Sequence, residues 1–268
     1  MFKKSSNLVM KFDSMGVRKA MEITHSKTKP NALAIEGTCN FRDLGGYRTE
    51  DGMHFRDHIC FRSDNLHRVA AAGIEQIKSL GVTKVIDLRR IDETNREPNV
   101  FSVHSIDQIE YVHIPLKFVP MPETTAPFTL GDLYRAIAEA NQYEIGNIIR
   151  HIISNSTGAT IFHCKAGKDR TGIIAALVLG IANVIKQDII DDYQITSSFI
   201  SPIMADLRAE RPEAISVDHY DQLLTTDPAY MEQFLQLLED KYGGVKLYLK
   251  TCGITEEEFI RFESRVKK

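Results

Sequence analysis

The ten residues from His163 to Gly172, HCKAGKDRTG, limit the folds open to this chain more than any other stretch. A short apolar run, GATIF at 158–162, precedes them, and a long apolar run, IIAALVLGIANVI at 173–185, follows them. The first run predicts a buried strand and the second predicts a largely buried helix. The decapeptide is therefore expected to form a strand-to-helix loop, and in α/β sheets ligands bind beyond the carboxyl ends of the strands.

This loop combines a thiol with the start of a helix. Backbone N–H groups in the first turn of a helix lack intrahelical partners and the helix dipole adds positive charge there, so a phosphate group is the natural occupant. Cys164 is expected to carry a stabilised thiolate and to act as a nucleophile. Arg170 can hold two oxygens of a tetrahedral phosphoryl group. Gly167 permits a tight bend, and Thr171 is expected to donate a hydrogen bond to the thiolate.

Two other interpretations of the loop are weaker. A core cysteine beside a solvated run of charges would not need an arginine and two lysines around the same turn. A nucleotide-binding P-loop would need Ser or Thr in place of Asp169 and a glycine in place of Phe162. The sequence therefore favours an anion-binding loop that carries a nucleophile.

Composition excludes several other classes of protein. The formal net charge is −3, so the chain has no overall positive field to attract nucleic acid. The cysteines, at positions 39, 60, 164 and 252, form no CxxC pair and no cluster at metal-ligand spacing, so neither a metal nor another cofactor is predicted. No apolar run is long enough for a membrane span. Transient contact between the protein and a membrane surface is compatible with this sequence. The basic N-terminus lacks an apolar signal region, so the cytoplasm is the default location, with secretion after signal removal left open.

The pattern along the chain predicts one catalytic domain after an N-terminal arm. Residues 1–30 are expected to form the arm and residues 31–268 the domain. Strands at 82–90 and 109–118 alternate with helical patterns, which predicts an α/β fold with a mostly parallel central sheet flanked by helices. Residues 118–156 are expected to be a helical insertion, either a lid over the site or an ordinary packed helix pair. The region from Asp188 to the end is predicted to be helical.

Further motifs occur in a definite order along the chain: NFRDLGGYRT, FRSDNL, VIDLRR with Glu93 and Pro98, HCKAGKDRTG, IIDDYQITSS and KYGGVKLYLKTCGIT. Together they resemble the atypical microbial cysteine-dependent tyrosine and lipid (phosphoinositide) phosphatases with the HCxxGKDRTG signature, from about Asn31 to the end. The resemblance implies a phosphatase fold and hydrolysis through a phosphocysteine on Cys164. In its CX5R loop, the phosphate-binding residues would be Lys165, Ala166, Gly167, Lys168, Asp169 and Arg170, supported by His163 and Thr171.

The source of the leaving-group proton departs from the common pattern of tyrosine phosphatases. The chain contains no tryptophan, so it lacks a Trp-Pro-Asp loop, and no carboxylate follows YVHIPL at 111–116. Related phosphoinositide phosphatases place an aspartate directly before the arginine, so we expect Asp169 to be the general acid. Asp87 and Asp92 are rival candidates for which a structural role is favoured.

The substrate class depends on two lysines. Lys165 and Lys168 add positive charge beside the phosphate site, and CKAGK resembles the loop of lipid 3-phosphatases, in which both lysines flank the inositol ring. Phosphoinositides and phosphotyrosine proteins are therefore the expected substrates. The alternative is a catalytically inactive module that binds phosphate or phosphoinositides on the same fold, although binding alone would not need the thiol.

Overall fold

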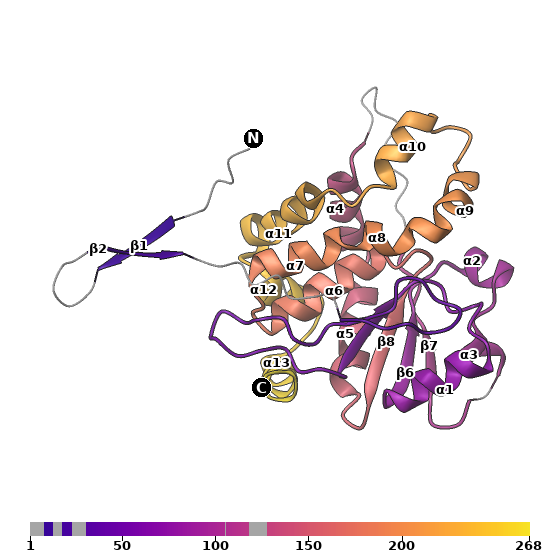
Figure 1. The fold of residues 1–268 in the computed structure, drawn as a ribbon, viewed down its shortest axis with the longest axis horizontal. Helices are drawn as coiled ribbons and strands as arrows, with labels where there is room; N and C mark the ends of the chain where they lie inside the picture. The colour runs from indigo at the N-terminus through magenta and orange to yellow at the C-terminus, as the bar shows by residue number, and fades with distance from the viewer. Residues whose placement is uncertain (1–7, 13–17, 23–30, 105, 118–127) are drawn as a thin grey trace.

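The computed structural model describes residues 8–12, 18–22, 31–104, 106–117 and 128–268. The main sheet has six strands in the order β3-β4-β5-β8-β6-β7. Figure 1 labels three of them, β8, β6 and β7. The bounds of the six strands are β3 Asn31–Ala32, β4 Arg42–Asp43, β5 Cys60–Ser63, β6 Val82–Asp87, β7 Glu110–His113 and β8 Ala159–His163. The strands from β5 to β7 pair in parallel, whereas the pairings β3·β4 and β4·β5 are antiparallel. The predicted α/β fold with a mostly parallel sheet is confirmed.

The register of this sheet brings the carboxyl ends of three strands to one edge. Ser63 at the end of β5 and Asp87 at the end of β6 both pair with His163 at the end of β8. Strand β8 is buried along its whole length, and its side chains alternate between two cores, with Phe162 in one and Ile161 in the other. The loops after these strands therefore meet where the HCKAGKDRTG segment begins.

Helices cover both faces of the sheet (Figure 1). The first six are α1 Ala71–Ser79, α2 Ile91–Arg96, α3 Val100–Val103, α4 Leu130–Ala140, α5 Gln142–Ser154 and α6 Asp169–Ile181. The C-terminal ones are α7 Lys186–Gln194, α8 Thr196–Ile200, the 3₁₀ turn η1 Ser201–Ile203, α9 Met204–Ala209, α10 Val217–Leu223, α11 Pro228–Tyr242, α12 Val245–Thr251 and α13 Glu256–Val266. The helix after the signature loop, α6, contacts α4, α5, α7, α12 and α13. These neighbours explain why its sequence is apolar on every side.

The helix pair α4–α5 is part of the main core. Tyr134 and Ile137 of α4 and Ile145 and Ile148 of α5 are fully buried in the same apolar cluster as α6. A Cβ atom on Gly146 of α5 would lie 2.0 Å from the Cys252 carbonyl oxygen, so the two segments are in close contact. The described part of 118–156 is thus packed into the core, and residues 118–127 lie outside the described residues, so both alternatives for this segment stay predictions.

A smaller apolar cluster covers the signature loop from the C-terminal side. Ile200 of α8 and Leu207 of α9 are buried together with Ala166 of the loop. Helix α10 follows, within the region from Asp188 onwards that the sequence predicts to be helical. The segment 196–226, which includes these helices, therefore lies against the loop.

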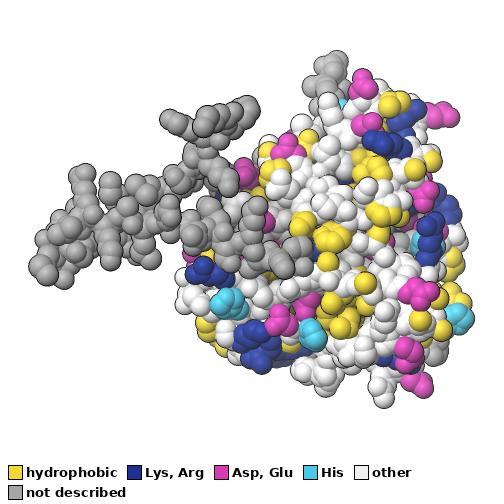
Figure 2. All heavy atoms as spheres, in the orientation of Figure 1, with side chains coloured by type: hydrophobic (Ala, Val, Ile, Leu, Met, Phe, Trp, Pro, Cys, Tyr) yellow, Lys and Arg dark blue, Asp and Glu magenta, His cyan; other side chains and the backbone are white. Residues whose placement is uncertain are grey.

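The N-terminal region contributes one separate pair of strands. Strands β1 (Leu8–Phe12) and β2 (Arg18–Glu22) are antiparallel to each other and belong to a two-stranded sheet of their own. Within the described ranges, every helix is too short or too polar to cross a bilayer. Acidic and basic side chains are interspersed on the face shown in Figure 2.

Candidate active site

The signature loop turns sharply between β8 and α6. Gly167 has a φ of +66°, and a Cβ atom there would lie 2.5 Å from the Ser63 carbonyl oxygen, so only glycine fits without strain. Cys164 follows directly after β8 and is 3% exposed. In the described part of the chain, no group accepts a hydrogen bond from the amides of residues 165–169. These amides are therefore available to bind the oxygens of a tetrahedral anion beside the thiol.

Two polar side chains hold this loop from behind. The Asn40 amide donates to the carbonyl oxygens of Ala166, at 2.9 Å, and Gly167, at 3.2 Å. The Arg62 guanidinium donates to the same Gly167 oxygen at 2.7 Å. Because the carbonyl groups are bound on this side, the amide groups of the loop can face the opposite side.

A buried carboxylate balances the charge of Arg62. Asp192 of α7 pairs with Arg62 and lies 3.5 Å from Arg42, and it accepts a hydrogen bond from Tyr47 at 3.0 Å. Burial by itself would raise the pKa of Asp192, but the two guanidinium groups outweigh it and hold the pKa below its usual value. Both arginines are fully buried, which the sequence pattern did not predict.

The arginine of the signature is held by a second buried carboxylate. Both terminal nitrogens of Arg170 donate to Glu93 of α2, at 2.6 and 2.8 Å, and both residues are about 5% exposed. Burial would raise the pKa of Glu93, but the pairing with Arg170 outweighs it and lowers the pKa. The backbone N–H of Arg90 donates to the same carboxylate at 2.8 Å. Glu93 therefore fixes the plane of the Arg170 guanidinium, a role that the sequence motif did not reveal.

The two rival acids have contacts that favour the structural alternative. Asp87 is fully buried and accepts hydrogen bonds from Arg89, Asn99 and Tyr111. Burial would raise the pKa of Asp87, but His163 and Arg89 outweigh it and hold the pKa far below its usual range, so this group stays ionised. Asp92 is 59% exposed and pairs with Arg90.

Asp169 has a more suitable environment for acid–base chemistry. It is the first residue of α6, and its side chain is 21% exposed. One carboxylate oxygen, Oδ1, accepts a hydrogen bond from the Tyr134 hydroxyl at 2.8 Å and lies 2.9 Å from the Lys168 ammonium. The group is thus fixed in orientation and still reached by solvent.

The two lysines that the sequence predicts to bind substrate phosphate each have partners within the protein. Lys168 is 2% exposed, and its ammonium donates to the carbonyl oxygens of Leu223, at 2.7 Å, and Thr225, at 3.1 Å. A buried ammonium needs such acceptors, so Lys168 ties the segment that contains Leu223 and Thr225 to the loop, beside its contact with Asp169. Lys165 pairs with Glu210 after α9.

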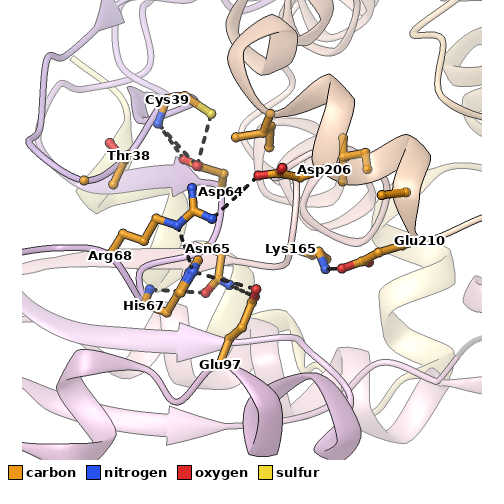
Figure 3. Close-up of a pocket in the computed structure, with 14 residues that line it drawn as sticks. Thr38, Cys39, Asp64, Asn65, His67, Arg68, Glu97, Lys165, Asp206 and Glu210 are labelled. Atoms are coloured by element: carbon orange, nitrogen blue, oxygen red, sulfur yellow. Dashed lines mark hydrogen bonds and ion pairs between the residues drawn. The ribbon is translucent and has the colours of Figure 1, made fainter.

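A cavity of about 520 Å³ lies beside Lys165 (Figure 3). Its cations face carboxylates: Lys165 meets Glu210 on one wall, and Arg68 extends towards Asp206 of α9 at 3.6 Å. An additional phosphate group that used Lys165 would therefore have to displace Glu210.

The supporting residues have the following contacts. His163 is fully buried, with Nδ1 3.1 Å from the Cys164 carbonyl oxygen and Nε2 2.8 Å from the Asn99 amide. The Thr171 hydroxyl is buried and has no hydrogen-bond partner within the described ranges, so the expected donation to the Cys164 thiolate is not formed in this structure.

Comparison with known proteins gives a consistent set of relatives. The model of the Tyrosine phosphatase family matches residues 33–267. A tyrosine-protein phosphatase of Nostoc commune is 30% identical over 222 residues, which cover 76% of this chain and 73% of that protein. The triple specificity protein phosphatase PtpB of Mycobacterium tuberculosis is 24% identical over 265 residues, 83% of this chain and 94% of the relative. Among solved structures, the catalytic domain of the PP-IP phosphatase SIW14 of S. cerevisiae is 12% identical, with a TM-score of 0.38 over 76% of this chain and 94% of that one.

The buried charge of Asp192 gives a stability prediction. Replacing Asp192 by Asn leaves Arg42 and Arg62 without a buried counter-charge and should lower the free energy of unfolding by about 3–5 kcal/mol at neutral pH. Because the pKa of Asp192 is lowered in the folded state, its stabilising contribution is complete above the usual value of 3.8 and is lost as the pH falls below it. Urea unfolding measured between pH 7 and pH 3 should therefore show that the free energy of unfolding falls less with acid in Asp192→Asn than in the wild type.

The neighbouring Asp191 is the matched control. It is exposed, and among the described residues its side chain bonds only to Gln187, on the same helix, at 2.8 Å. Asp191→Asn should change stability by less than about 0.5 kcal/mol. Equal losses in the two variants would contradict a special role for the buried pairings of Asp192.

Proposed function

Because this chain belongs to the tyrosine phosphatase family and is a phosphatase, we propose that it hydrolyses phosphate monoesters through a phosphocysteine on Cys164. The observation that carries the proposal is the arrangement around the thiol. Cys164 begins a turn whose amides are available to an anion, and Arg170 is held rigidly by Glu93 at the end of that turn. Such fixed donors stabilise charge that develops on a transferred phosphoryl group.

The first step forms the phosphocysteine. The Cys164 thiolate attacks phosphorus, a bond forms between sulfur and phosphorus, and the bond between phosphorus and the ester oxygen breaks. The electron pair of that bond goes to the leaving oxygen, which takes a proton from Asp169. The loop amides and Arg170 hold the three remaining oxygens.

The second step regenerates the enzyme. Asp169, now a carboxylate, accepts a proton from a water molecule as the water oxygen attacks phosphorus. The bond between sulfur and phosphorus breaks, the electron pair returns to Cys164, and inorganic phosphate leaves.

For the substrate, we propose phosphotyrosine together with phosphoinositides. The relative named a triple specificity phosphatase is consistent with a site that accepts several kinds of ester. Lys165 supports a second phosphate on the substrate because it is 18% exposed and its partner Glu210 is more exposed still, at 38%. Lys168 binds the backbone carbonyl groups of Leu223 and Thr225, so we expect it to contribute little to the choice between substrates.

The mechanism predicts that Cys164→Ser abolishes phosphate release while the fold persists, because a serine hydroxyl is not ionised near neutral pH. Phosphate release from p-nitrophenyl phosphate measures the loss, and circular dichroism checks the fold. Vanadate, which mimics five-coordinate phosphorus, should inhibit the wild type. Cys252→Ser changes another buried cysteine and should keep its activity. Wild-type protein that binds phosphotyrosine peptide or phosphoinositide but releases no phosphate would support the inactive binding module instead.

A second prediction separates the two lysines. Lys165→Met should reduce kcat/KM on a polyphosphorylated inositol lipid about 10–100-fold more than on a phosphotyrosine peptide, since a charge-assisted contact to the extra phosphate is lost. Lys168→Met should lower activity on both substrates alike and lower the melting temperature. Glu210→Gln should improve KM for the lipid, because it removes the carboxylate that competes for Lys165. Equal losses on both substrates in Lys165→Met would reject its part in lipid preference.

The role of Asp169 predicts a rate loss that depends on the leaving group. A general acid typically contributes about 10²–10⁴-fold, so Asp169→Asn should lose a factor in that range on phenyl phosphate, whose leaving oxygen needs the proton. In kcat/KM, which reports the steps up to the phosphocysteine and not its hydrolysis, the loss on p-nitrophenyl phosphate should be much smaller, because its phenol leaves without help. Rates measured across a series of aryl phosphates give this dependence. A dependence unchanged from the wild type would exclude Asp169 as the acid.

A further inference from the structure

Asp169 lies at the end of a chain of hydroxyl groups that comes from two helices outside the signature loop. Tyr134 of α4 donates to Oδ1 of Asp169 at 2.8 Å, and its hydroxyl oxygen lies 2.7 Å from that of Tyr193 in α7. A phenol has a single proton, and Tyr134 gives it to the carboxylate. Tyr193 must therefore be the donor to Tyr134, and the hydrogen bonds run in one direction towards Asp169.

The surrounding packing holds these hydroxyl groups in place. The Tyr134 ring is fully buried and meets the rings of Tyr193 and Phe234 edge to face, at centroid distances of 6.0 and 6.3 Å. Burial raises the pKa of Tyr134 and that of Tyr193, and the nearby Asp169 charge adds to the effect, so both phenols stay protonated. A neutral, immobile donor orients a carboxylate without adding a positive charge beside it.

The sequence of the signature itself makes room for this arrangement. A Cβ atom on Gly172 would lie 3.2 Å from a ring carbon of Tyr193. Even a methyl group at this position of α6 would require the Tyr193 ring, which carries the donor to Tyr134, to give way by a few tenths of an ångström. The glycine that ends HCKAGKDRTG is thus explained by a tyrosine that packs on the helix.

The contacts of the carboxylate distinguish its two oxygens. Tyr134 and Lys168 both bind Oδ1. Across the described ranges, no further hydrogen bond to Asp169 is recorded, so Oδ2 is the oxygen left to carry a proton. A general acid gains from such an arrangement, since a proton is transferred efficiently only from a group held in a fixed direction.

We propose that Tyr134, supported by Tyr193, is a positioning residue that holds Oδ1 of Asp169 and so directs the proton on Oδ2 towards the leaving oxygen. This inference rests on the proposed role of Asp169 as general acid. The transferred proton moves from Oδ2 to the ester oxygen as the bond from that oxygen to phosphorus breaks, and both tyrosines keep their own protons throughout. Tyr134 acts only through Asp169 and does not touch the substrate.

The test compares kcat and KM of Tyr134→Phe and the wild type on phenyl phosphate and p-nitrophenyl phosphate. Loss of one hydrogen bond to the acid should lower kcat/KM, which reports the steps up to the phosphocysteine, about five- to tenfold on phenyl phosphate, with little change in kcat/KM on p-nitrophenyl phosphate. Tyr193→Phe should give a smaller loss in the same direction. If Tyr134→Phe does not fold, this second variant alone decides, and an equal loss on both esters overturns the proposal.

Tyr248→Phe is the matched control. Tyr248 is a fully buried residue of α12 whose hydroxyl also bonds to α4, at the Ala138 carbonyl oxygen, 2.7 Å away. It should lower the melting temperature without any dependence on the leaving group. A Tyr134→Phe variant that behaves like Tyr248→Phe would show that the Tyr134 hydroxyl serves stability alone.

The double variant with Asp169→Asn separates the failure of this inference from the failure of the proposed acid. If Tyr134 acts through Asp169, Tyr134→Phe should have no further leaving-group effect in the Asp169→Asn background. If the loss in kcat/KM caused by Asp169→Asn is the same on both esters, Asp169 is not the acid, and the positioning role of Tyr134 is rejected with it. If the loss caused by Asp169→Asn is larger on phenyl phosphate and the loss caused by Tyr134→Phe is equal on both esters, only the positioning role is rejected.

Discussion

The hydrogen bonds from Asn40 and Arg62 to the carbonyl oxygens of Ala166 and Gly167 are the constraint on which the rest of the site depends. A short turn can present its amides to an anion only if its carbonyl groups face the other way. Buried carbonyl groups need donors, and neither the loop nor α6 supplies them here. The body of the protein therefore has to provide two donors at fixed places, and one of them is a cation.

That cation brings a chain of further requirements. Arg62 is fully buried, so it needs a buried counter-charge, and Asp192 provides it. Asp192 is in turn shared with Arg42, which also bonds to Asn40. Buried ion pairs of this kind contribute little net stability compared with apolar packing, because both charges lose their hydration. We infer that this network fixes the orientation of the loop carbonyl groups and so of the loop amides on the opposite side.

Helix α7 connects the two halves of the site through consecutive residues. Asp192 faces the arginines behind the loop, whereas Tyr193 packs on α6 and reaches Tyr134. The backbone of the anion site and the orientation of Asp169 therefore depend on the placement of one short helix. Its packing against α6 and α11 explains why the helical C-terminal region matters for a loop that lies far before it in the sequence.

The sequence by itself determined the local parts of this protein. The apolar runs on either side of HCKAGKDRTG predicted β8 and α6, and the spacing of Cys164 and Arg170 predicted an anion-binding turn, because each pattern reports geometry within a few residues. Only the tertiary structure decided which side chains surround that turn. Glu93, Asp192 and Tyr134 lie tens of residues from the loop and leave no periodic signal. The Lys168 ammonium contacts Asp169 and also binds two carbonyl groups of a distant segment, which no local pattern could show. The packing of α4 and α5 into the core was open for the same reason: an amphipathic pattern shows that a helix has an apolar face but not what that face meets.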